Sequence, residues 1–173
     1  MHELVSKGID GGKWNSISVL LCSLINYTLI IITTKRISPS EYGVVVLAFS
    51  LIEFSYLFIN AGLGPALIQK KSISSHEVRS AYTITIILAL FSYFILLLST
   101  SFLSDFFNDS NLKDVLPILG IIFIFRAFTS IPKALLQKNL QFKEIMLIDI
   151  SSFLLGYLIF GIFLVFNGFG YWS

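Results

Sequence analysis

Three ionisable residues, Glu53, Arg126 and Asp149, stand in or beside long apolar stretches of the sequence. Glu53 is the only charged residue between positions 42 and 69, and Arg126 is the only one between positions 115 and 132. Asp149 directly precedes a run without charge. A charge in apolar surroundings is stable only when it is paired or reaches water. These side chains could therefore form an ion pair that fixes packing, or line a polar path that matches the charge of a transported molecule.

Other chemistry-bearing residues are sparse. The sequence has no GxxxxGK[ST] phosphate loop, no HExxH or CxxC motif, and no Ser, His and Asp in one plausible place. Cys22 is the lone cysteine, so it cannot form an intrachain disulfide, and His2 and His76 are isolated in predicted loops. The sequence predicts no catalytic centre, no metal site, no cofactor and no nucleic-acid partner, so we expect a protein that is not an enzyme.

The elements that must position these charges are membrane-spanning helices. Only 13% of the 173 residues are charged and the mean hydropathy is +0.85, whereas soluble domains carry about 25% charged residues. About 20 apolar residues are needed to cross a bilayer as a helix. The sequence predicts an all-α, polytopic helix bundle that forms one membrane domain over residues 1–173. Its predicted helices run over residues 15–34, 44–63, 81–103, 115–131 and 145–166, and a sixth begins at 168–173.

The depths of the three charges in the bilayer can be compared along these helices. Helices 44–63 and 115–131 cross the membrane in the same direction. Glu53 lies nine residues after the start of the first of these helices, and Arg126 lies eleven residues after the start of the second. At 1.5 Å per residue, their levels differ by about 3 Å. Asp149 and Arg126 both lie near the cytoplasmic ends of their predicted helices. Depth alone leaves both Glu53 and Asp149 open as partners of Arg126.

The positive charges of the loops indicate the orientation. Lysines and arginines gather on the side of the N-terminus, with eight there and three on the opposite side. Short cytoplasmic loops are enriched in Lys and Arg, so we expect a cytoplasmic N-terminus and an outward-facing loop at 104–114. The eight are Lys7, Lys13, Lys70, Lys71, Arg79, Lys133, Lys138 and Lys143, and the three are Lys35, Arg36 and Lys113.

Turn and cap residues support the helix boundaries. Ser38 or Ser40 can cap the second helix, with Pro39 in its first turn. The Gly and Pro residues of the stretch 62–65 are expected to break or kink the end of that helix.

Two further prolines bound the fourth predicted helix. Pro117 is expected in its first turn and Pro132 at its end. The segment 132–144 mixes apolar residues with three lysines. It suits either a short amphipathic helix on the cytoplasmic membrane surface or a plain basic loop, and the sequence leaves both open.

Five phrases of the sequence, in this order and spacing, resemble a known transporter family. The polysaccharide transporter family comprises bacterial Wzx-type flippases, with exporters of O-antigen, colanic-acid and teichuronic-acid repeat units, and belongs to the MATE-like multidrug/oligosaccharidyl-lipid/polysaccharide exporter superfamily. The phrases are GGKWNSIS (Gly11–Ser18), RISPSEYG (Arg36–Gly43), GLGPALIQKKSIS (Gly62–Ser74), IPKALLQKNLQFKEI (Ile131–Ile145) and GFGYWS (Gly168–Ser173).

The resemblance implies a two-lobed protein of the bacterial cytoplasmic membrane that works by alternating access. Such proteins move oligosaccharide units on undecaprenyl pyrophosphate to the outer face, among membrane lipids and beside the polysaccharide polymerase machinery. Their central cavity is often cationic, a role that Arg126 would fill here. Lys70, Lys71, Lys133 and Lys138 would meet the headgroup at the cytoplasmic mouth, although the positive-inside rule alone also explains these lysines.

Compared with that family, the sequence corresponds to about the first third, an incomplete N-terminal lobe. We therefore expect a fragment of a longer protein or a truncated gene product. Two other functions stay open. A cation-coupled MATE-type drug antiporter would use Glu53 as its protonatable acid, whereas a non-transporting membrane scaffold or remnant would use the buried charges only for packing.

Overall fold

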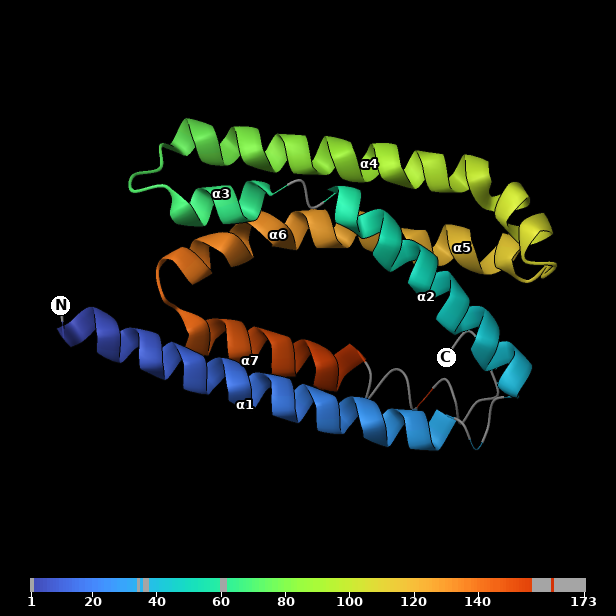
Figure 1. The fold of residues 1–173 in the computed structure, drawn as a ribbon, viewed down its shortest axis with the longest axis horizontal. Coiled ribbons are helices and arrows are strands. Elements are labelled where there is room, and N and C mark those ends of the chain that lie inside the picture. Colours follow the sequence, from blue (N-terminus) through green and yellow to red (C-terminus); the bar gives the residue numbers. More distant parts are fainter. Residues whose placement is uncertain (1, 34, 36–37, 60–61, 157–162, 164–173) are drawn as a thin grey trace. The chain divides into compact units, whose positions relative to one another are not determined.

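The computed structural model describes residues 2–33, 35, 38–59, 62–156 and 163. These residues form helices and connecting turns, with no strand among them, so the all-α prediction is confirmed (Figure 1). The helices are α1 (His2–Thr33), α2 (Pro39–Ile59), α3 (Leu63–Gln69), α4 (Ser75–Phe106), α5 (Leu112–Gly120), α6 (Ile122–Lys138) and α7 (Phe142–Phe153).

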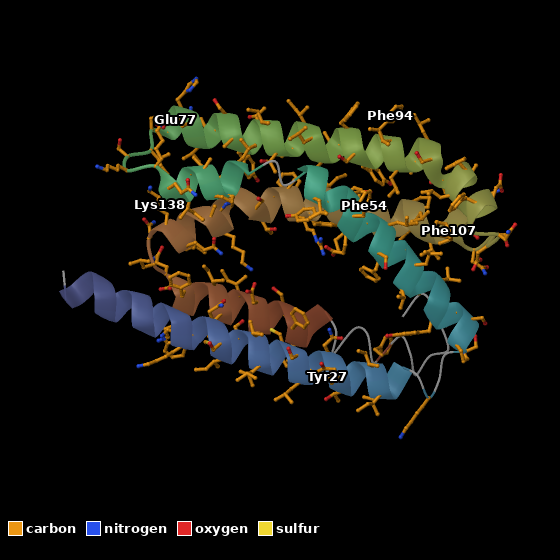
Figure 2. All side chains as sticks on the ribbon, in the orientation of Figure 1. Tyr27, Phe54, Glu77, Phe94, Phe107 and Lys138 are labelled. Atoms are coloured by element: carbon orange, nitrogen blue, oxygen red, sulfur yellow. The ribbon has the colours of Figure 1, made fainter. Side chains whose placement is uncertain are left out.

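Four stretches of the described helices are long and apolar enough to cross a membrane. Their large apolar side chains face outward: the side chains of Phe94 on α4 and Tyr27 on α1 point away from their helices (Figure 2). Contiguous exposed apolar surface of this extent suits contact with lipid rather than with water. The chain is a multi-pass membrane protein whose candidate spans are Gly11–Ile32, Pro39–Leu57, Ser75–Phe106 and Leu112–Lys138.

The chain divides into two compact units, which we describe separately. The terminal unit comprises residues 1–42 and 136–173, and the central unit comprises residues 43–135. In the terminal unit α7 lies beside α1 (Figure 1). Glycine at position 11 permits this approach, because a Cβ there would collide with the ring of Phe142. One turn further along α1, the Lys143 ammonium lies 5.7 Å from the centre of the Trp14 ring.

In the central unit, α3 and α5 pack against α4. The tightest contact is at Gly120, where a Cβ would come within 2.6 Å of Leu96 Cδ2 and 3.0 Å of the Tyr93 ring. Because position 120 has no side chain, the backbone of α5 approaches α4 closely. The largest fully buried side chains of this unit are Phe123, Ile52, Leu112, Leu116, Ile131 and Val115.

Both α2 and α4 begin with a capping box of the form S-x-x-E. At α4 the Glu77 N–H donates to Ser74 Oγ (3.3 Å) and the Ser74 N–H donates to Glu77 Oε2 (3.0 Å). At α2 the Glu41 N–H donates to Ser38 Oγ (3.3 Å) and the Ser38 N–H donates to Glu41 Oε2 (3.0 Å). Each box satisfies backbone donors that a helix start leaves open. Of the two serines considered from the sequence, Ser38 is the cap.

Helices α4 and α6 end in a second local motif, with a residue in the left-handed region. Asn108 has φ 52° and Leu140 has φ 55°. After α6, the Leu140 N–H donates to the Gln137 carbonyl (3.0 Å) and the Gln141 N–H donates to the Leu136 carbonyl (2.9 Å). This is the Schellman arrangement, and it turns the chain between α6 and α7.

The predicted interruption after the second helix is present. Helix α2 ends at Ile59, Gly62 adopts φ 75°, and the separate short helix α3 begins at Leu63. A positive φ suits glycine because it has no Cβ to meet the following carbonyl. The predicted helix 44–63 thus corresponds to α2, which starts and ends earlier.

The expectations for the two other prolines were wrong. Pro117 lies inside α5 rather than in its first turn, because α5 begins already at Leu112. Pro132 does not end its helix: α6 continues to Lys138. Proline lacks an N–H for the ladder and its ring crowds the carbonyl four residues earlier, but buried Ile131 and Ala134 on either side hold this stretch in the core. The segment 132–144 is therefore neither of the two forms expected, but the end of α6, a turn and the start of α7.

The predicted helix 115–131 is divided between α5 and α6. At the junction, the Ile121 N–H donates to the Ile118 carbonyl (3.3 Å), while the Pro117 carbonyl accepts a hydrogen bond from the Tyr93 hydroxyl (3.0 Å). A side chain of α4 thus satisfies a carbonyl that the helix ladder leaves open. Of the predicted helix 145–166, α7 contains the first part. Positions 157–162 and the predicted sixth start at 168–173 lie outside the described residues.

Candidate functional site

The central unit joins two of the three predicted charges in an ion pair. Arg126 Nη2 on α6 donates to Glu53 Oε1 on α2, across 73 positions of sequence. Helix α2 presents Glu53 in the middle of its apolar length, and α6 presents Arg126 four positions after it begins. The pair is not sealed in the unit, because 30% of the Arg126 side chain and 53% of the Glu53 side chain are exposed.

Tyr56 completes this site, which we call the Arg126 site (Glu53, Tyr56 and Arg126). The Arg126 Cζ lies 4.7 Å from the centre of the Tyr56 ring. Tyr56 follows Glu53 by three residues on α2, a spacing that places two side chains on one helix face. The guanidinium is thus held by a carboxylate and by an aromatic face, which attracts a cation through its quadrupole. Sequence reasoning missed Tyr56, and its i, i+3 spacing from Glu53 is the signal that could have found it.

The arrangement fits anion binding rather than bond chemistry. A guanidinium carries five N–H donors in a planar fork, so it can bind a carboxylate and a second anion at once. Arginine also keeps its charge in apolar surroundings, and its fork matches the oxygens of a phosphate. The Arg126 side chain is partly exposed, at 30%. Arg126 can therefore bind a phosphate either beside Glu53 or in place of Glu53.

The remaining acid lies elsewhere. Asp149 is on α7, in the terminal unit, whereas Glu53 and Arg126 lie in the central unit. Its role as a cavity residue stays a prediction.

The four predicted mouth lysines lie directly after α3 and in the second half of α6. Lys70 follows α3 directly and forms an ion pair with Glu77 in the first turn of α4. Lys71 lies next to it in the α3–α4 loop and is exposed. Lys133 and Lys138 both lie on α6, with Lys138 as its last residue. Contact of these lysines with a substrate headgroup stays a prediction.

Metal-binding clusters are not found in the part of the chain that the structure describes, where no three His, Cys, Asp or Glu side chains gather. Charge-based binding of an anion by Arg126 needs no such cluster.

Comparison with known proteins identifies relatives over most of the chain. The sequence model of a family described as "Polysaccharide biosynthesis protein" matches residues 33–173. A protein of Klebsiella pneumoniae named "Uncharacterized membrane protein in cps region" is 26% identical over 155 residues, 90% of this chain. The lipopolysaccharide biosynthesis protein WzxC of Escherichia coli K12 is 23% identical over 155 residues. The teichuronic acid biosynthesis protein TuaB of Bacillus subtilis 168 is 25% identical over 167 residues, 95% of this chain.

The chain spans about a third of the length of these relatives, namely 32% of the Klebsiella protein, 32% of WzxC and 35% of TuaB. No solved structure matches it significantly. The similarity therefore concerns one portion of longer membrane proteins, and this portion contains the Arg126 site.

Proposed function

Because a family model matches residues 33–173, the chain belongs to the polysaccharide biosynthesis protein family of Wzx type, and from this premise we propose that it is the N-terminal portion of a lipid-linked oligosaccharide flippase. The flippase moves repeat units carried on undecaprenyl pyrophosphate from the cytoplasmic to the outer face of the bacterial cytoplasmic membrane. The family match is the observation that carries this proposal. The protein acts as a transporter and not as an enzyme.

The Arg126 site supplies the chemistry that such a substrate needs. A pyrophosphate crossing the membrane brings negative charge into a medium of low dielectric, where an unpaired charge is unstable. Arg126 binds one phosphate through its fork, and Glu53 neutralises Arg126 when the substrate is absent. Both side chains are partly exposed, which is consistent with access of an anionic molecule to the pair.

The transport cycle requires a second lobe. Alternating access needs a cavity that opens to one face at a time, and a single partial bundle cannot enclose one. The curated relatives are about three times as long as this chain, which leaves room for further helices in the full protein. In this proposal, the face of α2 and α6 that carries the Arg126 site looks into the cavity between the lobes.

The orientation follows from the positive charges. The α3–α4 loop, with Lys70 and Lys71, and the start of α4, with Arg79, lie in the cytoplasm together with the N-terminus, and the α4–α5 loop faces outward. Lys133 and Lys138 then lie at the cytoplasmic mouth, where the loaded lipid enters.

A deletion of the encoding gene tests the proposal. We expect loss of the surface polysaccharide and accumulation of undecaprenyl-pyrophosphate-linked repeat units inside the cell, measured by mass spectrometry of extracted lipids. The wild-type gene should restore both, Arg126→Gln should not, and Arg126→Lys should restore them in part because it keeps the charge but loses the fork. Normal polysaccharide in the deletion strain would favour a scaffold or remnant. Proton-dependent efflux of a cationic dye, without an effect on polysaccharide, would favour an antiporter.

A further inference from the structure

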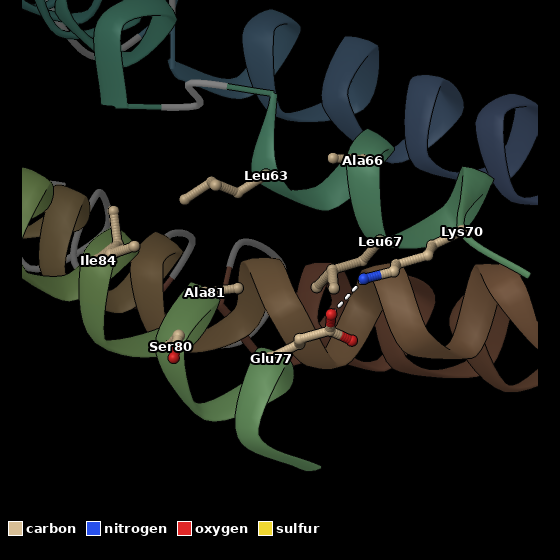
Figure 3. Close-up of a pocket in the computed structure, with 8 residues that line it drawn as sticks. All are labelled: Leu63, Ala66, Leu67, Lys70, Glu77, Ser80, Ala81 and Ile84. Atoms are coloured by element: carbon tan, nitrogen blue, oxygen red, sulfur yellow. Dashed lines mark hydrogen bonds and ion pairs between the residues drawn. The ribbon is translucent and has the colours of Figure 1, made fainter. Parts of the chain in front are cut away.

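A groove between α3 and α4 lies apart from the Arg126 site. It has a volume of about 280 Å³ and is lined only by residues of these two helices and by Lys70 (Figure 3). Its floor is made by Leu67 and Ala81, which belong to a buried cluster with Ile131 of α6. The residues beneath the groove are therefore part of a packed core.

The lining divides into an apolar part and a charged end. Leu63 and Ile84 lie at one end of the groove, and the Lys70–Glu77 ion pair closes the other (Figure 3). From Glu77 to Ile84 is seven residues along α4, about 10 Å at 1.5 Å per residue. This length matches the boundary zone in which lipid headgroups pass into acyl chains. The groove thus has the polarity profile of a single lipid molecule.

The charged end is built to keep a cation in place. Glu77 accepts hydrogen bonds from the Ser74 N–H and from Lys70, so the capping box of α4 fixes the carboxylate that anchors Lys70. The Lys70 side chain is exposed and positively charged, so its charge attracts a phosphate at this end of the groove while Lys70 stays paired with Glu77. Lys71 and Arg79 are exposed in the same loop and the first turn of α4. The loop therefore favours an anionic headgroup over a zwitterionic one.

From these observations we infer that the α3–α4 groove binds one anionic phospholipid of the cytoplasmic leaflet. An acyl chain lies along Leu63, Leu67, Ala81 and Ile84, and the phosphate lies at Lys70. In a bilayer an apolar groove is filled by lipid, and basic sites on the cytoplasmic side select anionic headgroups. The inference rests on the cytoplasmic placement of the α3–α4 loop proposed above, but not on the identity of the transported molecule. The lipid is a resident of this site and not the cargo of the Arg126 site.

Photo-crosslinking of lipid to the full-length protein tests this site. The protein is reconstituted in phosphatidylethanolamine vesicles that contain either phosphatidylglycerol or further phosphatidylethanolamine with a diazirine in the acyl chain. We expect labelling of peptides from α3 and the first turns of α4, with phosphatidylglycerol favoured. Lys70→Gln should reduce that preference about fivefold, the effect of one cation near a membrane surface. Lys113→Gln is the matched control, because Lys113 also pairs with an α4 acid, Asp105, but lies at the opposite end of that helix.

A second variant fills the groove. Ala66 lines it and is exposed, so Ala66→Trp occupies the space without entering the buried cluster. It should abolish labelling of α3 and leave labelling near Phe94 unchanged. Equal labelling by both lipids, labelling spread evenly along α4, or insensitivity to Ala66→Trp would each overturn the inference. Displacement of the probe by equimolar undecaprenyl pyrophosphate would also overturn it, since the groove would then belong to the substrate. Since crosslinking needs no transport, a protein that binds lipid but fails to export polysaccharide would contradict only the proposed function.

Discussion

Arg126 contacts two chemically different groups on one helix face. The Glu53 carboxylate forms an ion pair with the guanidinium, and the Tyr56 ring lies against it in a cation–π contact. The two contacts act differently when an anion arrives: a phosphate competes with the carboxylate for N–H donors, but it does not compete with the ring face. Under the proposed function, Tyr56 keeps the guanidinium in place while a substrate phosphate replaces Glu53.

The Arg126 site predicts different outcomes for stability and for transport. Glu53→Gln or Arg126→Gln alone removes one charge of the ion pair and leaves the other at membrane depth, where a charged side chain costs about 2.5–3.5 kcal/mol on insertion scales. Each single variant should therefore lower the melting temperature of the purified protein. The double variant removes both charges, and it should recover most of the stability but none of the transport.

The double-mutant cycle separates the two roles of the pair. If the double variant also recovers transport, the charges serve only packing and Arg126 does not bind substrate. If the destabilisation of the double variant equals the sum of the two single effects, the two charges do not depend on each other.

Gly120 predicts a purely structural effect. Gly120→Ala places a Cβ within 2.6 Å of Leu96 Cδ2 and 3.0 Å of the Tyr93 ring, so the Leu96 and Tyr93 side chains of α4 must shift. Overpacking of this kind costs about 1–3 kcal/mol, measured as a loss of unfolding free energy or melting temperature. Gly43→Ala is the control, because nothing lies within 4 Å of a Cβ at that position of α2. Equal effects of both substitutions would show that the α4–α5 contact is looser than described.

Part of the site was predictable because charges in apolar sequence are conspicuous. Glu53 and Arg126 stood out by type, and helix rise placed them at similar depth. The pairing of Arg126 with Glu53 joins side chains 73 positions apart in the sequence, and no local pattern specifies such a contact. Tyr56 was missed because a tyrosine in a membrane helix has many ordinary positions, and only its neighbour at i−3 distinguishes it.

At the scale of elements, local signals succeeded where contacts are local. The cap predicted at Ser38 or Ser40 and the glycine at position 62 gave a correct helix start and a correct interruption. Pro132 misled because a proline is a weak stop signal when the helix around it is held by burial, here of Ile131 and Ala134. The division between α5 and α6 was also unpredictable, since it involves a hydroxyl from Tyr93 on another helix.

The capping box of α4 predicts a local loss. Ser74→Ala removes the acceptor of the Glu77 N–H and should cost about 1 kcal/mol. We expect faster hydrogen exchange of the amides in the first turn of α4, measured by mass spectrometry. Ser75→Ala is the control, since Ser75 is the first residue of the helix and not its cap. Equal exchange in both variants would mean that the box does not hold the helix start.

At the scale of the whole molecule, the topology can be tested with two serines in opposite loops. Ser110 lies between α4 and α5, and Ser72 lies between α3 and α4. In a Cys22→Ala background, Ser110→Cys should react with a membrane-impermeant maleimide in intact spheroplasts. Ser72→Cys should react only after permeabilisation, because the positive-inside rule places its loop in the cytoplasm. The reverse pattern would invert the proposed orientation and place the α3–α4 groove in the outer leaflet.

The capping boxes of α2 and α4 also bear on how the protein is made. Each box involves residues only three positions apart, Ser38 with Glu41 and Ser74 with Glu77, so it can close as soon as four residues have left the ribosome. Under the proposed topology, one box opens a helix at the outer face and the other at the cytoplasmic face. Two successive membrane passages can thus begin at defined residues during translation, before any partner helix has been synthesised.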